Sequence, residues 1–294
     1  MMQNKGHMGL TPIFSSDSDK NFFYQDLVET NIMKEVFKSD RIKLKYDYKK
    51  FDFQKEVTKN LINLGIIKKK DFVEINNDLS RLHEILSNGE KKLDKHELNS
   101  VTRKFYEFDY KLQMLYVSFL KNVISPIFPN KIFYQKNPTF RFSFPQKKDK
   151  FVKRYHSDVM LGHPPRELNI WINITDVFST NSLRIMNLKK SLSLLKKCDM
   201  NFELFSERVQ YDKLFQKELK KNSCSLEMRY GDFTIFDSRC FHCTQQNRTD
   251  KTRVSMDIRV IQDKDFELLK RKYTGTGRKK SKFVPGEYYA QKKI

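Results

Sequence analysis

Two histidines and one aspartate in this chain form a set that could bind a metal ion. His156 and Asp158 are two residues apart, and His242 lies far downstream. Residues two apart in a β-strand project from the same face, so His156 and Asp158 could reach one ion from a single extended segment. Two imidazoles and one carboxylate cap one face of an octahedron and leave the opposite positions open. The sequence therefore predicts an iron(II) site with room for further ligands, including O2.

A basic residue after the second histidine could anchor a dicarboxylate. Arg253 lies eleven residues past His242, far enough for one strand to turn and the next to run back beside it. A guanidinium holds a carboxylate through two parallel hydrogen bonds. Ser255 faces the same way on a strand and could donate another. We therefore expect 2-oxoglutarate as co-substrate, with its keto-acid end on iron and its far carboxylate on Arg253 and Ser255.

The cysteines beside His242 offer zinc as a competing metal. Cys240 and Cys243 flank this histidine, and both Cys and His are zinc ligands. A C-x-x-C pair needs a second ligand pair, and Cys198 and Cys224 are poorly spaced to provide one. The sequence thus favours iron. Four scattered cysteines also argue against a disulfide framework, so we expect a reducing, cytoplasmic location.

The elements that must position these residues divide the chain into a helical part and a strand-rich part. Apolar residues recur at steps of three and four in 71–86 and 97–124, which predicts helices, and weaker helical patterns cover 22–37 and 51–64. After Pro138 the period becomes two, in 140–144, 168–174 and 253–260. Residues 187–222 return to helical spacing. They are expected as an insertion near the mouth of a barrel, where they could act as a lid.

Each alternating segment has one apolar face and one polar face. The polar face would meet solvent in an open sheet, whereas it would line the interior of a barrel that houses a reaction. Arg253 and Ser255 lie on the polar face, which favours the barrel. We expect Asn169, on such a face, to contact the cofactors. Candidates for substrate contacts are Arg141, Glu167, Trp171 and Arg259. The two arginines could instead pair with Asp257 or Glu167.

Several motifs of the second half, taken in order, resemble those of a known family. They are H-S-D-x-x-x-G-H-P at 156–164, E-L-N-I-W at 167–171, T-N-S-L at 180–183, G-D-F-T-I-F-D at 231–237, N-R-T at 247–249 and R-V-S-M-D-I-R at 253–259. Residues 141–261 are thereby similar to the phytanoyl-CoA-hydroxylase-like branch of Fe(II)/2-oxoglutarate-dependent dioxygenases. Within this branch they most resemble hydroxylases of the streptomycin-biosynthesis type.

The resemblance implies a mainly β fold, a double-stranded β-helix (a cupin-like jelly roll) flanked by α-helices. It places His156, Asp158 and His242 on iron, and Arg253 with Ser255 on 2-oxoglutarate. Many relatives have glycine directly after the distal histidine, where this chain has Cys243. We expect a helical region at 1–130 packed on the core, the core at 131–262 with the insertion 187–222, and a basic helix or tail at 263–294.

The polar strand faces suggest the type of substrate. A polar interior is costly to dehydrate unless a ligand supplies hydrogen-bond partners. We therefore expect hydroxylation of a small polar metabolite, such as a sugar, an aminocyclitol or an amino-acid derivative, with release of succinate and CO2. The alternatives are an oxygenase of the same metal class that acts on nucleic acid or protein, or on an acyl or lipid substrate.

The charge of the chain adds one further partner to consider. The formal net charge is +21, which makes nucleic acid a possible ligand. Lysines are dispersed, apart from concentrations at 147–154 and from Lys270 to the end, so solvated surfaces and a basic tail explain most of the charge. No apolar run reaches the ~18 residues of a membrane span, and no span is expected. The sequence does not specify an oligomeric state.

We expect weak, sequence-independent DNA or RNA binding that depends mainly on the tail after Lys270 and disappears near physiological salt. The reason is that binding through dispersed lysines is driven by counterion release, which salt suppresses. Fluorescence anisotropy over a salt series, with the tail lysines changed to glutamine as comparison, tests this. Tight, structure-selective binding at physiological salt would instead favour a nucleic-acid substrate.

Overall fold

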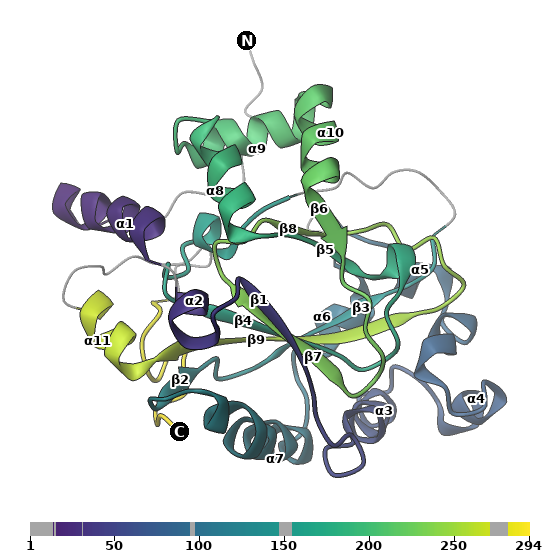
Figure 1. The fold of residues 1–294 in the computed structure, drawn as a ribbon. Helices are drawn as coiled ribbons and strands as arrows, with labels where there is room; N and C mark the ends of the chain where they lie inside the picture. Colours follow the sequence, from purple (N-terminus) through teal and green to yellow (C-terminus); the bar gives the residue numbers. More distant parts are fainter. Residues whose placement is uncertain (1–13, 15, 31, 95–97, 147–154, 271–281) are drawn as a thin grey trace.

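Two antiparallel sheets face each other at the centre of the molecule (Figure 1). The structure is a computed structural model that describes residues 14, 16–30, 32–94, 98–146, 155–270 and 282–294. The larger sheet has the order β1-β7-β4-β9-β2, with β3 also paired to β9, and the smaller has the order β6-β5-β8. The strands are β1 (Arg41–Lys45), β2 (Ile132–Tyr134), β3 (Thr139–Ser143), β4 (Leu168–Asn173), β5 (Leu183–Met186), β6 (Ser223–Ser225), β7 (Asp232–Asp237), β8 (His242–Thr244) and β9 (Arg253–Gln262). This core is a double-stranded β-helix, as predicted.

The register of the larger sheet gathers its polar positions on one face. Asn169 of β4 lies opposite Arg259 of β9, and Asn173 lies opposite Ser255. Directly paired residues project to the same side of a sheet, so these side chains share the face that looks toward the smaller sheet. The opposite face carries Leu168, Ile170, Ile172, Val254, Met256 and Ile258, all within the main apolar core. The polar alternation therefore lines the interior, as the barrel interpretation requires.

The outer face of the larger sheet is covered by helices from the first part of the chain. The rings of Phe140 and Phe142 on β3 lie 4.9 and 5.2 Å from that of Phe105, centroid to centroid. The elements of this layer are α2 (Ile32–Phe37), α3 (Phe53–Asn63), α4 (Lys69–Glu74), η1 (Leu79–Glu84), α5 (Asn88–Lys91), α6 (Ser100–Lys104), α7 (Tyr110–Phe119), η2 (Leu120–Ile124) and η3 (Ser125–Ile127). Edge-to-face aromatic packing stabilises this layer against the sheet.

The expected helical region differs from the structure in three places. The single helix expected over 97–124 is broken before α7, because the Asp109 side chain accepts the Leu112 N–H at 2.9 Å and caps a new helix. The helix expected over 71–86 is broken at Asn76 and Asn77, whose left-handed φ angles of 58° and 55° end the helical turn. Residues 41–45 form β1, which pairs with β7, so the first 130 residues also supply a strand of the sheet.

Residues 187–222 form three helices on the outer face of the smaller sheet: α8 (Leu188–Lys196), α9 (Phe202–Tyr211) and α10 (Lys213–Asn222). The ring of Phe205 stacks on that of Phe241 at 4.0 Å and 12°, directly before His242 in the chain. Cys243 belongs to the same apolar cluster. The insertion thus packs behind β8 rather than over the interior, which does not support the expectation of a lid.

Both ends of the described chain are fixed to this core. The Arg166 guanidinium binds Asp26 of α1 (Asp17–Glu29) at 2.6 Å and Asp265 of α11 (Asp263–Lys270) at 3.1 Å. The last residues run along β2, where Ile132 and Ile294 exchange backbone hydrogen bonds of 2.8 and 3.0 Å. The end of the expected basic tail is therefore part of the sheet edge. The basic stretches 147–154 and 271–281 lie outside the described residues.

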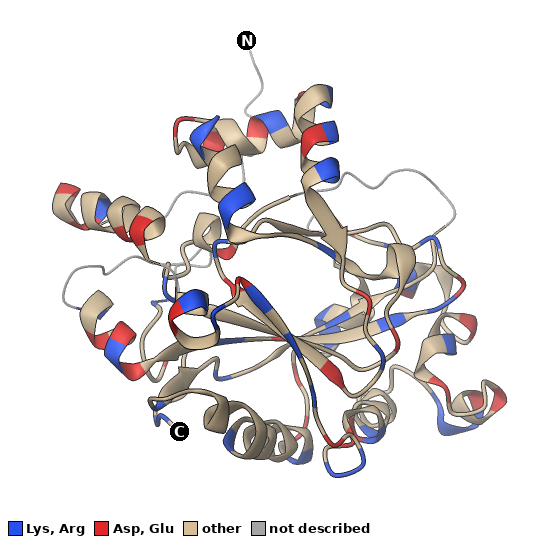
Figure 2. Cartoon of the chain, viewed as in Figure 1, with Lys and Arg blue, Asp and Glu red and all other residues tan. Residues whose placement is uncertain are grey.

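Charged side chains of both signs interleave along the surface helices (Figure 2). Lysines on α8 have no acidic neighbour within that helix, whereas α9, α10, α4 and α11 each carry charges of both signs. In the part of the chain that the structure describes, none of the helices combines the length and the apolar character needed to cross a bilayer.

Replacing Phe205 with alanine should lower the free energy of unfolding by about 3–5 kcal/mol, because it removes a fully buried ring and leaves a cavity beneath β8. Urea unfolding measures the change. Leu214→Ala is the matched control, since Leu214 lies on the same insertion but is 76% exposed, and it should change stability by less than about 0.5 kcal/mol. Equal effects of the two substitutions would show that the insertion is not packed on β8.

Candidate metal centre and co-substrate site

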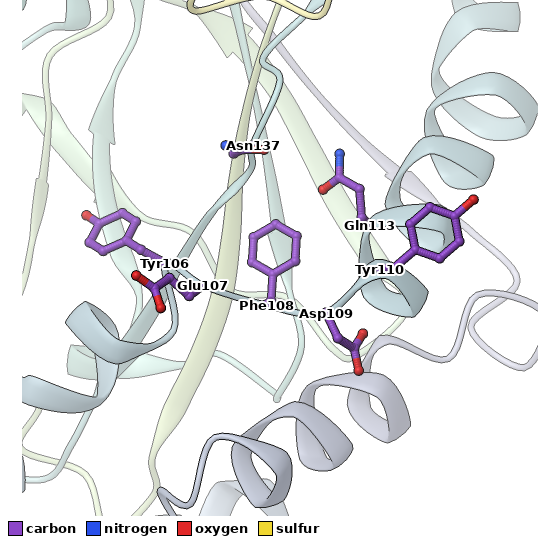
Figure 3. Close-up of a pocket in the computed structure, with 7 residues that line it drawn as sticks. All are labelled: Tyr106, Glu107, Phe108, Asp109, Tyr110, Gln113 and Asn137. Atoms are coloured by element: carbon purple, nitrogen blue, oxygen red, sulfur yellow. The ribbon is translucent and has the colours of Figure 1, made fainter.

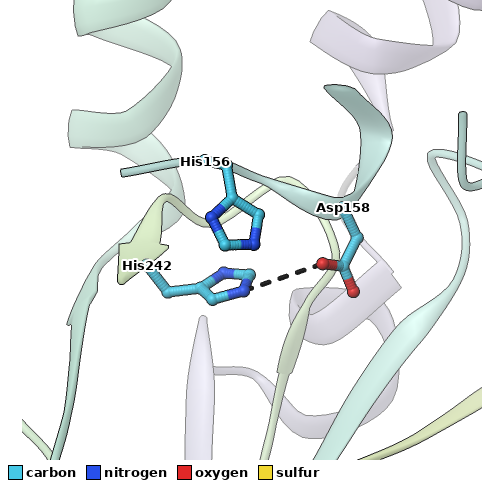
Figure 4. Close-up of side chains that lie close together, drawn as sticks. All are labelled: His156, Asp158 and His242. Carbon is cyan, nitrogen blue, oxygen red and sulfur yellow. Dashed lines mark ion pairs between the residues drawn. The ribbon is translucent and has the colours of Figure 1, made fainter. Parts of the chain in front are cut away.

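His156, Asp158 and His242 converge between the two sheets (Figure 4). One ligand atom of each lies within 4.8 Å of those of the other two. The two histidines exchange backbone hydrogen bonds of 3.0 and 2.8 Å, which bring their rings to 4.5 Å. His242 Nε2 lies 3.6 Å from Asp158 Oδ1. The predicted triad is therefore assembled, and a single ion could contact one ligand atom from each of the three residues.

The aspartate reaches this point by a different local structure from the expected strand. His156 forms an isolated bridge to His242, and Asp158 begins the short 3-10 helix η4 (Asp158–Leu161). Ser157 between them is extended, with φ −117° and ψ 156°, which preserves the relation of residues two apart. Gly162 ends η4 with φ 94°, a left-handed conformation that suits glycine. The spacing argument placed both side chains on the same side of the chain, although they belong to a bridge and a 3-10 helix rather than to one regular strand.

The ring of His242 is oriented by its other nitrogen. Its Nδ1 lies 3.0 Å from the carbonyl oxygen of Cys240, and a proton on Nδ1 would leave Nε2 as the free lone pair. On this short strand, Cys243 turns to the opposite side and joins the apolar cluster under the insertion. Among the described residues the candidate metal-binding group contains no cysteine. The structure thus gives no support to the zinc alternative.

Asp158 has a buried carboxylate in which one oxygen accepts a hydrogen bond and the other does not. Its Oδ2 accepts a hydrogen bond from Arg259 Nε at 3.0 Å. Burial disfavours the charged form, yet Arg259 and the neighbouring histidines hold the pKa of Asp158 well below its usual range. Its Oδ1 has no hydrogen-bond partner among the described residues. A buried anionic oxygen beside two imidazoles suits a divalent cation, so the residues present fit iron(II).

A second group of unpaired polar atoms surrounds Arg253. This arginine is 3% exposed, and its Nη1 donates to the carbonyl oxygen of Asn181 at 3.2 Å. Its Nε, Ser255 Oγ and Asn173 Oδ1 are buried without a hydrogen-bond partner in the described part of the chain. Burial lowers the pKa of Arg253 to about 10, and nearby Arg141 adds to the effect while Asp257 opposes it. A guanidinium so desolvated is stabilised by an incoming carboxylate, so this group fits the far end of 2-oxoglutarate.

Asn169 and Trp171 lie between these two groups on β4. Both polar atoms of the Asn169 side chain are buried without a partner among the described residues. In the sheet Asn169 lies opposite Arg259, which places it at the metal end of the interior. The Arg253 guanidinium lies 5.8 Å from the centre of the Trp171 ring. Both residues therefore line the polar interior, where the alternation of β4 placed them.

Three expected substrate residues have partners that the structure identifies. Glu167 is fully buried, accepts the Tyr289 hydroxyl at 2.9 Å and pairs with His163 at 2.5 Å, so it joins the C-terminal segment to the loop after η4. Arg141 pairs with Asp257 at 3.4 Å, which is one of the pairings considered from the sequence. Arg259 pairs with Asp158 instead of either expected acid. Glu167 therefore lies in a structural network rather than at an open surface.

Two residues of the interior were not identified from the sequence. Asn173 continues the polar alternation of Asn169 and Trp171, so the period of two could have found it. Asn181 lies in the T-N-S-L motif, where its carbonyl oxygen receives Arg253 and its side-chain nitrogen is buried without a partner among the described residues. The Arg253–Asn181 contact joins two segments far apart in the chain, and no local sequence pattern predicts it.

A separate shallow pocket of about 280 Å³ lies on the outer, helical side of the molecule (Figure 3). It is lined by Tyr106, Glu107, Phe108, Asp109, Tyr110, Gln113 and Asn137. One of its two carboxylates is already committed, because Asp109 caps α7. None of the lining residues belongs to the polar interior, so the pocket is distinct from the candidate metal centre.

Comparison with known proteins gives one family match and one curated relative. The phytanoyl-CoA dioxygenase (PhyH) family model matches residues 68–255. The streptomycin biosynthesis protein StrG of Streptomyces griseus is 24% identical over 180 residues, which are 57% of this chain and 70% of that protein. These matches confirm the resemblance found in the motifs of the second half.

Solved structures of other proteins align with most of this chain. The carbocyclase SnoK from nogalamycin biosynthesis, described as a non-heme α-ketoglutarate-dependent enzyme, aligns over 91% of this chain and 89% of its own, with 13% identity and a TM-score of 0.46. EctD from S. alaskensis, in its apo form, aligns over 87% of this chain and 82% of its own, with 11% identity and a TM-score of 0.46.

Arg253→Ala should weaken 2-oxoglutarate binding by about thirtyfold or more, since loss of one partner of a buried charged pair costs about 2–5 kcal/mol. Calorimetric titration of manganese-loaded protein measures the affinity without turnover, and manganese binding itself should persist. Arg81→Ala, which removes an arginine from an exposed helical pair with Glu84, is the control. Unchanged co-substrate affinity in Arg253→Ala would assign the carboxylate to another residue.

Proposed function

The chain belongs to the phytanoyl-CoA dioxygenase family and is an iron- and 2-oxoglutarate-dependent oxygenase, and from this we propose that it hydroxylates an unactivated C–H bond of a small polar metabolite. The substrate class is a sugar, an aminocyclitol or an amino-acid derivative. His156, Asp158 and His242 would hold the iron, and Arg253 with Ser255 would bind the far carboxylate of 2-oxoglutarate. The observation that carries the proposal is the row of buried, unpartnered polar atoms on β4 and β9.

Iron with 2-oxoglutarate supplies the oxidising chemistry, in which one atom of O2 enters succinate and the other enters the product, while the keto acid loses CO2. The protein contributes position. Two imidazoles and one carboxylate leave the remaining coordination positions to co-substrate and O2. Arg253 and Ser255 fix the far carboxylate, which orients the keto-acid end toward the metal. Trp171, Ile185 and Phe236 form part of an apolar cluster between the sheets that limits water.

The interior also offers groups for a polar substrate. Arg141 and Asp257 lie on the polar face, and their side chains are 40% and 19% exposed, so this pair borders the accessible part of the interior. The 3.4 Å contact between them is long for a strong charged hydrogen bond. Hydroxyl, amino or carboxylate groups of a substrate could replace this Arg141–Asp257 contact with little loss of free energy. The name of the relative StrG, a streptomycin biosynthesis protein, supports a metabolite of this polar kind.

Acyl and nucleic-acid substrates would each require a different lining of the site. An acyl chain, as the family name suggests, requires a long apolar channel. The β4 and β9 positions that face the interior are instead Asn169, Trp171, Asn173, Arg253, Ser255, Asp257 and Arg259. Nucleic acid is favoured only by the net charge of +21. These two classes are therefore comparison substrates in the test.

Succinate release should be coupled one-to-one with substrate consumption when the iron-loaded enzyme meets a panel of amino sugars, aminocyclitols and amino-acid derivatives. Mass spectrometry of the product should show the addition of one oxygen atom. Asp158→Ala is the negative control, because it removes the anionic ligand. Coupled turnover confined to acyl-CoA thioesters or to methylated nucleic acid would contradict the polar-metabolite assignment and leave the oxygenase chemistry intact.

A further inference from the structure

The Asp158–Arg259 pair is an interaction that the ligand set alone does not require. Arg259 Nε donates to Oδ2 of the carboxylate at 3.0 Å, while Oδ1 lies 3.6 Å from His242 Nε2 and has no hydrogen-bond partner among the described residues. The two oxygens of one side chain thus have different environments. One is held by a cation of the protein, and the other lies beside the two histidines.

Arg259 is rigidly placed for this contact. It lies in β9 between neighbouring strands, opposite Asn169 of β4. Its carbonyl oxygen accepts the Gln135 N–H at 2.8 Å on the other side. Asp158, by contrast, lies at the start of a short 3-10 helix outside either sheet. The guanidinium therefore connects the short helix η4 to β9, which pairs with β2, β3 and β4.

We propose that Arg259 is a positioning residue for the metal centre: it holds Oδ2 of Asp158 so that Oδ1 alone faces the ion. This inference deepens the proposed function and rests on it. A carboxylate bound in this way cannot turn both oxygens to one cation, which keeps coordination positions open for co-substrate and O2. The pair also offsets the charge of Asp158 before the metal arrives, so the triad is preassembled.

This role replaces the substrate contact expected for Arg259 from the sequence. A substrate anion could bind this arginine only by displacing Asp158 and leaving its carboxylate buried and less well paired, which is strongly unfavourable. Arg141 has no such commitment, because its partner Asp257 is 3.4 Å away and partly exposed. Of these two arginines, Arg141 is thus the better placed for substrate.

Cobalt(II) is the probe, because its visible absorption changes on coordination and it can be titrated without turnover. Arg259→Gln and Arg259→Met both remove the charged donor, and the methionine side chain is long and apolar. Each should raise the cobalt dissociation constant by roughly ten- to a hundredfold, the range typical of residues that orient metal ligands. Arg259→Lys should recover part of the affinity, since it retains a charged donor. Arg103→Gln removes the same group from the Arg103–Asp94 pair among the helices and should leave cobalt binding unchanged.

Thermal unfolding of each metal-free variant separates this role from general stability. If Gln at this position prevents folding, the Met variant supplies the same test. At saturating cobalt, 2-oxoglutarate affinity should fall less than in Arg253→Ala. Wild-type cobalt affinity in a folded Gln or Met variant would overturn the proposal, and weakened 2-oxoglutarate binding in that variant would assign Arg259 to the co-substrate. A wild-type protein that binds no cobalt would overturn the metal centre and the role of Arg259 together.

Discussion

The pairing register of β4 with β9 is the constraint on which the rest of the structure depends. It sets Asn169 beside Arg259 and Asn173 beside Ser255, so that polar side chains of β4 and β9 gather on one face of the sheet. A shift of the register by one residue would turn these side chains outward and put Ile170 and Ile258 inside. The apolar packing under the helical layer fixes the register, since the alternative would expose that core. Packing on the outside of the sheet thus determines the chemistry on its inside.

A polar interior must be neutralised group by group, because unpaired charges are costly away from water. Asp158 is compensated by Arg259, and Asp257 by Arg141. Arg253 is the exception: it has only the Asn181 carbonyl and the Trp171 ring as close partners that the structure records, and burial lowers its pKa. The incomplete compensation at this position is what a dicarboxylate would complete. The site is therefore poised to gain stability when co-substrate binds.

The sequence predicted the parts of this molecule that follow a short period or a fixed chemistry. The period of two in 253–260 gave the polar face, and the donor types of His156, Asp158 and His242 gave the metal. The sequence was less informative where contacts between residues far apart in the chain determine the structure. Asp109 and Asn76 break helices whose apolar spacing continues through them, and β1 forms only because β7 offers a free edge. The Arg259–Asp158 contact joins residues about a hundred positions apart, so the alternation showed where Arg259 points but not what it binds.

The helical insertion and the C-terminal segment both support residues of the metal centre. Phe205 of α9 stacks on Phe241, which fixes the strand that carries His242. Tyr289 binds Glu167, whose other oxygen pairs with His163, and the His163 N–H donates to the Asp158 carbonyl oxygen at 3.2 Å. One ligand is thus supported through an apolar contact and another through a hydrogen-bonded chain. Because these supports do not involve Arg141 and Asp257, the metal geometry can be kept rigid while those two residues at the accessible side vary with the substrate.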